Sequence, residues 1–139
     1  MNKIYITIEV IRQIKETIGT YPIESGGIIG GSDTCITHFC FDASSKENEY
    51  APNVSFLNEK IKEWADNDVS FLGIIHSHPS FSTSHSKEDL DYAIKLKEKN
   101  PFLSRIIFPI VILKEKDIEL HFYELVDKSF IEIPYEIKE

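Results

Sequence analysis

The chain has few cysteines and no long apolar run, and each of these features excludes a class of protein. Its 139 residues include two cysteines, Cys35 and Cys40. They lie five positions apart in one predicted strand and therefore point to opposite faces, so we expect no disulfide between them. Two lone thiols are typical of a protein in the reducing cytoplasm. No apolar run approaches the roughly 18 residues of a membrane span, and we expect neither a membrane partner nor a signal peptide.

Basic residues are scarce relative to acidic ones. The chain has 15 lysines and arginines against 23 aspartates and glutamates, which gives a net charge of −8. A protein that binds nucleic acid or anionic lipid through phosphate contacts needs a basic surface, so neither is expected as the main partner. We interpret the negative charge as a contribution to solubility.

The rest of the composition is that of an ordinary globular protein. Hydrophobic residues make up 42% of the chain and charged residues 27%. We find no repeat, low-complexity tract or linker that would divide it. These features predict one domain that covers residues 1–139.

Apolar periodicity predicts a mixture of strands and helices. Alternating isoleucines from Ile4 to Ile8 predict a strand, and a helix should follow that Thr7 caps and Gly19 ends. Pro109 and Pro134 predict edge or bulged strands. Further strands are predicted over 23–31, 34–41, 71–75, 106–113, 118–125 and 131–137, further helices over 57–65 and 86–100, and a polar loop over 42–53. The fold class is therefore α/β (α+β), a single mixed β-sheet with three helices packed around it.

Two histidines stand where the strand over 71–75 ends. His76 and His78 are two residues apart, so their side chains leave the same face and can reach one metal ion. After seven further residues comes Ser86-Lys87-Glu88-Asp89, which puts Asp89 in the first turn of a helix. Two histidines and a carboxylate make the three protein ligands of a typical catalytic zinc site. Ser86 and Asp89 also form a helix capping box, and the two interpretations are compatible because a hydroxyl both accepts and donates.

Glu24 opens an unusual glycine-rich segment, Glu-Ser-Gly-Gly-Ile-Ile-Gly-Gly. An unpaired carboxylate is costly to bury, so Glu24 is exposed to solvent, partnered or functional. A functional carboxylate here could take a proton from water and pass it to a leaving amine.

The joint pattern resembles a known family. Glu24, the His-x-His-Pro sequence at His76 and the Ser-x-x-Asp sequence that starts at Ser86 resemble the JAMM motif of the JAB/MPN zinc metalloproteases. The segments around Glu24 and around residues 73–79 fit as well, and the resemblance spans residues 23 to 91. It is nearest to the bacterial stand-alone type.

The resemblance implies an MPN/JAB (cytidine-deaminase-like) architecture and one zinc ion per chain. His76, His78 and Asp89 would hold the metal, and Glu24 would act as general base and then general acid toward a metal-activated water. Ser86 would stabilise the oxyanion that develops.

The resemblance also implies a function. The protein would be an isopeptidase or peptidase that hydrolyses the bond after the C-terminus of a ubiquitin-like protein, in deconjugation or precursor processing. Small bacterial members of the family are encoded beside E1- and E2-like conjugation enzymes, and such enzymes are potential partners. Two alternatives stay open: a catalytically silent MPN-type scaffold, and a protein of DNA processing that resembles the RadC group, which the acidic charge disfavours.

Three features near the motif have no assigned role. His85 precedes Ser86 where the family often has proline; it could be an extra ligand, a supporting residue or an exposed side chain, and we favour the last. Phe81 could line a substrate groove or anchor its loop. The polar loop over 42–53 could form one wall of that groove or be a solvated connection.

Overall fold

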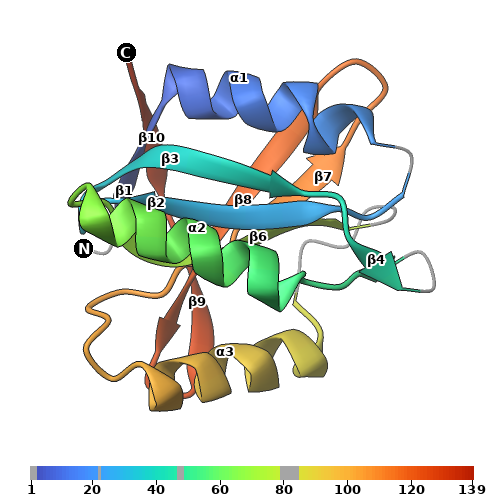
Figure 1. The fold of residues 1–139 in the computed structure, drawn as a ribbon. Coiled ribbons are helices and arrows are strands. Elements are labelled where there is room, and N and C mark those ends of the chain that lie inside the picture. The colour runs from blue at the N-terminus through green and yellow to red at the C-terminus, as the bar shows by residue number, and fades with distance from the viewer. Residues whose placement is uncertain (1–2, 22, 47–48, 79–84) are drawn as a thin grey trace.

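The structure, a computed structural model, describes residues 3–21, 23–46, 49–78 and 85–139. In this part of the chain three α-helices surround an eight-stranded mixed sheet, beside a short two-stranded hairpin (Figure 1). In chain order the elements are β1 (Ile4–Thr7), α1 (Ile8–Glu16), a 3₁₀ turn (Ile18–Thr20), β2 (Gly26–Gly31), β3 (Cys35–Asp42), β4 (Ser45–Lys46), β5 (Glu49–Tyr50), α2 (Val54–Asp66), β6 (Ser70–His78), α3 (Lys87–Lys99), β7 (Ile110–Leu113), β8 (Ile118–Val126), β9 (Ser129–Ile133) and β10 (Tyr135–Lys138). The predicted fold class is confirmed.

The start of the chain differs in detail from the prediction. Thr7 caps α1 as expected, because its Oγ1 accepts a hydrogen bond from the Val10 N–H at 3.2 Å. Ile8, however, begins the helix instead of continuing the strand, and the helix ends at Glu16. Gly19 lies in the 3₁₀ turn that follows. Cys35 and Cys40 are free thiols, and no helix among the described residues is long and apolar enough to cross a bilayer.

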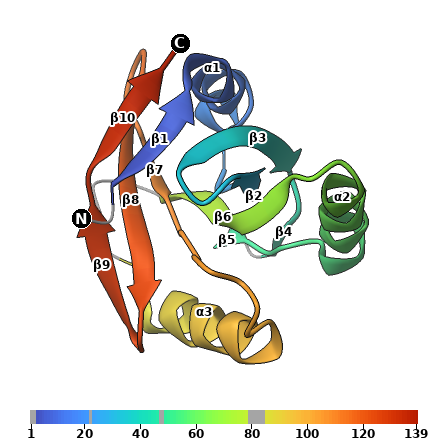
Figure 2. The ribbon, with the colours of Figure 1, turned by 90° about the vertical axis from the view of Figure 1, so that its left-hand side faces the viewer.

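The predicted last strand over 131–137 is in fact two strands. The sheet order is β10-β1-β3-β2-β6-β7-β8-β9, so β9 and β10 lie at opposite ends although they are consecutive in the chain. Pro134 separates them, and its carbonyl accepts a hydrogen bond from the Ile4 N–H at 3.1 Å. Proline has no N–H for the ladder, so the strand breaks there. The sheet curls enough for the chain to pass from one end to the other (Figure 2).

Of the two alternatives expected at Pro109, an edge or a bulged strand, the edge is wrong and a local irregularity is observed. β7 begins after this proline and lies in the interior of the sheet, between β6 and β8. The stretch before it is irregular: Ile107 forms an isolated bridge with Glu124, and its N–H donates to the Leu72 carbonyl of β6 at 2.7 Å. The Pro109 carbonyl accepts a hydrogen bond from the His76 N–H at 3.3 Å. The missing N–H is thus accommodated by an interruption of the ladder instead of by an edge.

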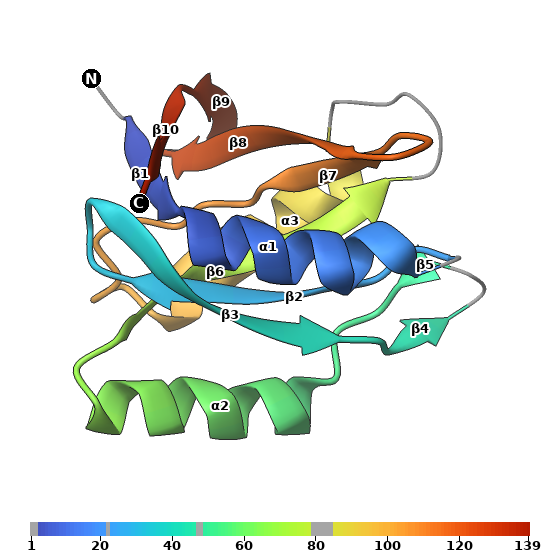
Figure 3. The same ribbon diagram turned by 90° about the horizontal axis from the view of Figure 1, so that it is seen from above.

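The two faces of the sheet bury different cores because neighbouring residues of a strand point to opposite sides. Ile29 of β2 and Ile75 of β6 pack in the cluster that includes the apolar side of α1. Ile28 and Ile74 pack in the other cluster, with residues of α2 and α3. Figure 3 shows α1 lying across the sheet, with α2 on the other side. From Ile74 onward the even-numbered residues of β6 therefore face α3, and this parity places the candidate site. Before the register shift at Gly73 the parity is reversed, and Leu72 packs in the α1 cluster.

Gly73 is required where β6 passes the irregular stretch before β7. Its φ is +157°, and a Cβ added there would lie 1.7 Å from the Ile107 carbonyl oxygen. We expect Gly73→Ala to lower the free energy of unfolding by about 3 kcal/mol, measured by urea denaturation.

Gly19→Ala is the matched control for this prediction. A Cβ at Gly19 would have its closest contact with the Cγ2 atom of Ile118, at 3.2 Å, and that side chain can shift. Its other contacts, at 3.5 Å or more, are of ordinary van der Waals length. We expect a change below about 1 kcal/mol. Equal losses in the two variants would contradict the steric argument.

Candidate metal centre

Strand β6 presents two imidazoles toward the first turn of α3. His76 and His78 have the same parity as Ile74, so they lie on the α3 face of the sheet. Both are in the part of β6 that pairs in parallel with β7, opposite Ile110 and Ile112. The spacing predicted that they share a face, and they do: their ring centroids are 4.8 Å apart.

The start of α3 supplies the carboxylate. Ser86 is the N-cap, and a complete capping box joins it to Asp89: Ser86 Oγ accepts from the Asp89 N–H, and Asp89 Oδ2 accepts from the Ser86 N–H, both at 3.1 Å. The capping interpretation is therefore confirmed. The same box holds the Asp89 carboxylate at the helix end that faces β6.

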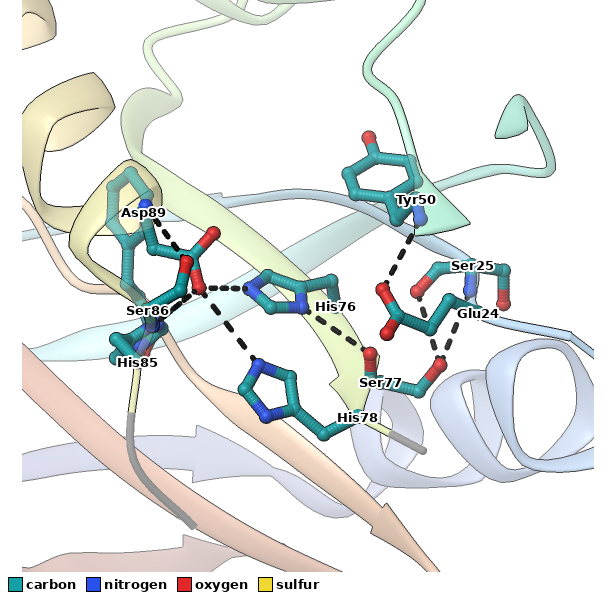
Figure 4. A network of polar contacts seen from close by, with 10 residues as sticks. Glu24, Ser25, Tyr50, His76, Ser77, His78, His85, Ser86 and Asp89 are labelled. Atoms are coloured by element: carbon teal, nitrogen blue, oxygen red, sulfur yellow. Dashed lines mark hydrogen bonds and ion pairs between the residues drawn. The ribbon is translucent and has the colours of Figure 1, made fainter. Parts of the chain in front are cut away.

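Asp89 Oδ2 is the common neighbour of the two histidines. It lies 3.6 Å from His76 Nε2 and 3.8 Å from His78 Nε2 (Figure 4). A third imidazole, that of His85, joins the group, and the four ligand atoms all lie within 4.8 Å of one another. The structure thus brings together the three predicted ligands and His85, for which a ligand role was considered but not preferred.

The orientation of His76 fits a metal ligand. Its Nδ1 lies 3.3 Å from the Ser77 carbonyl oxygen, which can only accept, so Nδ1 carries the hydrogen. Its Nε2 is buried and has no hydrogen-bond partner among the described residues. A buried nitrogen lone pair aimed at a carboxylate is costly unless a cation lies between them. Imidazole nitrogens with a carboxylate oxygen suit zinc, so the residues present fit that ion.

The charge state of Asp89 also suits a metal-binding site. Burial raises its pKa, but the contacts with His78 and His85 and the charge interaction with His76 outweigh burial, and the pKa falls well below its usual range. Asp89 is therefore an anion at neutral pH, which is the state that binds a cation.

His76 makes stability depend on pH in the metal-free protein. Burial lowers its pKa to about 4, against 6.5 ordinarily, although the Asp89 charge opposes this. Between these values the unfolded chain binds more protons than the folded one, so the free energy of unfolding falls as pH decreases from 6.5 to 4. We expect a loss of about 3 kcal/mol, measured by urea denaturation across that range. His76→Asn should flatten the dependence, and an unchanged slope would contradict this origin.

The pairing of β2 with β6 brings Glu24 to the same place. Gly26 pairs with His76, and beyond this pair the Ser77 N–H donates to the Ser25 carbonyl at 2.9 Å. Glu24, one residue earlier, thus lies near the end of β6. Its Oε1 accepts a hydrogen bond from the Tyr50 N–H at 3.1 Å. In Figure 4 the imidazoles of His76 and His78 lie between Asp89 on one side and Glu24 on the other.

These groups line one cavity of about 680 Å³. The predicted loop over 42–53 contains the small β4–β5 hairpin. Tyr50 and Pro52 form part of the cavity wall, which is one of the two roles considered for this loop. The Tyr50 hydroxyl donates to Asp42 Oδ2 at 2.9 Å, which fixes the loop to the end of β3. The remaining lining residues include Glu24, His76, His78, Ser86, Glu88, Asp89, Tyr92 and Phe108. Phe81, for which two roles were considered, lies outside the described residues.

The preferred interpretation of His85 as an exposed residue is wrong. Its side chain is only 3% exposed. The ring lies against Phe130, with centroids 4.4 Å apart, and its Nε2 is 2.8 Å from the Phe108 carbonyl oxygen. A sequence signal existed, because His85 is four residues before Asp89. The aromatic neighbours from β8 and β9, however, are distant in the chain and could not be read from that spacing.

Comparisons with known proteins agree with this architecture. A family model described as "Prokaryotic homologs of the JAB domain" matches residues 8–125. A solution structure of a protein from Desulfitobacterium hafniense is 18% identical, covers 98% of this chain and 93% of that chain, and gives a TM-score of 0.73. The crystal structure of a JAB1/MPN domain protein from Archaeoglobus fulgidus is 19% identical, with 98% and 97% coverage and a TM-score of 0.59. These likenesses show the fold, and a search of curated proteins found no match.

Proposed function

Because the chain belongs to the family of prokaryotic homologs of the JAB domain, we propose that it is a zinc-dependent peptidase or isopeptidase. The observation that carries the proposal is the convergence of two histidines and Asp89 on one point, with Glu24 in the same cavity. A metal centre alone would suit a structural role. General acid–base catalysis requires, in addition, a carboxylate that lies beside the metal centre and is not one of its ligands.

The ligands would be His76, His78 and Asp89. A bound zinc ion supplies Lewis acidity, which polarises a carbonyl group and lowers the pKa of a water molecule. Asp89 is kept in place by the capping box with Ser86, and the hydrogen bond of His76 to the Ser77 carbonyl orients its ring. Such supporting contacts maintain the ligand geometry.

Glu24 is the proposed acid–base group. Its Oε1 is fixed by the Tyr50 N–H, so the carboxylate is held within the cavity. As a base it takes a proton from the attacking water. As an acid it then delivers that proton to the leaving amine, which becomes a neutral product.

Ser86 is the proposed oxyanion donor. Its Oγ accepts the Asp89 N–H, and a hydroxyl that accepts one hydrogen bond still has its own proton to donate. A donor in the cavity wall can stabilise the negative charge that develops on the carbonyl oxygen.

The proposed substrate is the C-terminal tail of a ubiquitin-like protein, joined by a peptide or isopeptide bond. The cavity combines Tyr50, Pro52 and Tyr92 with the polar cluster. An extended peptide can therefore pack on apolar groups while the carbonyl of the bond to be cleaved lies beside the metal ligands. β6 is already paired on both sides. The tail therefore has to bind across the cavity instead of extending the sheet beside β6.

The test combines metal content with cleavage. Protein purified without chelator is expected to contain about one zinc per chain by elemental mass spectrometry. It should cut at least one member of a panel of ubiquitin-like proteins fused to a reporter, and chelator should abolish the cut until zinc is restored. No zinc even after addition would favour a catalytically silent scaffold. Zinc without any cleavage would remove the ubiquitin-like substrate from the proposal.

A further inference from the structure

The imidazole ring of His85 is fixed by a hydrogen bond and by aromatic contacts. One nitrogen, Nε2, lies 2.8 Å from the Phe108 carbonyl oxygen. The ring packs against Phe130 and Tyr123, with centroid distances of 4.4 and 5.1 Å. An imidazole fixed in this way cannot turn away from Asp89 without losing this hydrogen bond and its aromatic contacts.

The Phe108 contact determines what the second nitrogen presents. A carbonyl oxygen only accepts, so Nε2 carries a hydrogen, and in the neutral ring Nδ1 has the lone pair. Nδ1 lies 3.4 Å from Asp89 Oδ2. The neutral ring thus aims an acceptor at a carboxylate, as His76 does with its Nε2. Metal-ligating histidines commonly donate their other N–H to a backbone carbonyl in this manner.

We propose that His85 is a fourth protein ligand of the metal centre, through Nδ1. The inference rests on the proposed metal centre and adds a ligand to the three that the motif implies. The attacking water would then bind as a fifth ligand, a coordination number that catalytic zinc reaches during reaction. Ligands about 2.0–2.1 Å from a tetrahedral zinc ion are about 3.3 Å from one another. The His85, His76 and His78 nitrogens lie 3.4, 3.6 and 3.8 Å from Asp89 Oδ2. Of these three distances, that of His85 is the nearest to the distance expected between two ligands of one zinc ion.

A different arrangement would give His85 only a positioning role. In that arrangement Nδ1 also carries a hydrogen and donates it to Asp89, which orients the carboxylate without contact with the metal. Both arrangements predict that loss of His85 weakens metal binding, so affinity alone does not separate them. The number of imidazoles bound to zinc does.

The experiment counts those imidazoles by X-ray absorption spectroscopy of the zinc-loaded full chain. Wild-type protein is expected to show three, and His85→Phe two. Phenylalanine keeps a ring between Phe130 and Tyr123 but has no nitrogen. His38→Phe and His121→Phe, the two histidines outside the cluster, should both keep three. Competition with a chromogenic chelator should give His85→Phe a zinc affinity lower by about tenfold or more.

The outcomes separate the two proposals. Two imidazoles in wild-type protein would overturn the fourth ligand and leave the peptidase proposal standing. Three in wild-type protein and three in His85→Phe would assign the third imidazole to another histidine and also overturn it. Absence of bound zinc would overturn both proposals. If His85→Phe fails to fold, the counts in wild-type protein and in the two control variants still decide.

Discussion

The His78→Ala protein is expected to show neither the proposed zinc binding nor the proposed peptidase activity. His78 is one of the proposed ligands that converge on Asp89 Oδ2, and its side chain is only 12% exposed. Changes to residues that merely support a ligand already cost about 10- to 100-fold in metal affinity, so removal of a ligand should cost at least about 100-fold. Cleavage of the fusion substrate should fall to the background level, because the Lewis acid is then absent.

The measurement needs a control that separates metal loss from misfolding. His38 lies on β3 in an exposed position outside the cluster, and His38→Ala should keep about one zinc per chain and full activity. Far-ultraviolet circular dichroism should show the same helix and strand content in both variants. Full activity of His78→Ala without metal would rule out the metal-dependent mechanism.

Glu24→Gln is expected to separate metal binding from catalysis. Glutamine retains a carbonyl oxygen that can accept the Tyr50 N–H, so the side chain should keep its position. It cannot take up and release a proton at neutral pH. We therefore expect a normal zinc content and a kcat lower by about 10²- to 10⁴-fold, since proton transfer by a positioned group contributes that much.

Glu88 offers a matched control for this substitution. It also lines the cavity but lies in the exposed first turn of α3. Glu88→Gln removes the same charge from the same cavity and should keep kcat within about threefold of wild type, as expected of a surface substitution. Normal cleavage by Glu24→Gln would show that another group carries the proton. Equal losses in both variants would point to the charge of the cavity instead of a proton relay.

Local patterns predicted most of the elements but not every boundary. The apolar spacing of α1 and α2 and the cap at Thr7 depend on contacts within a few residues, and they hold. The last strand was predicted as one because its apolar residues keep a single parity across Pro134. Parity cannot tell whether two segments pair with the same neighbour. Here β9 pairs with β8 and β10 with β1, because the curled sheet brings its two ends within reach of one short connection.

The site divides in the same way. The sequence by itself determined the side-chain directions that depend on backbone geometry: His76 and His78 on one strand face, and Asp89 joined to Ser86 in one helical turn. Only the tertiary structure decided that α3 lies over that face and that β2 brings Glu24 to it.

The burial of His85 could not be predicted from the sequence either. It results from Phe108, Tyr123 and Phe130, which the order of β7, β8 and β9 brings together. The periodicity of a strand or helix determines where a side chain points. What it meets depends on which distant segments share the sheet, and that is decided by packing of the whole chain.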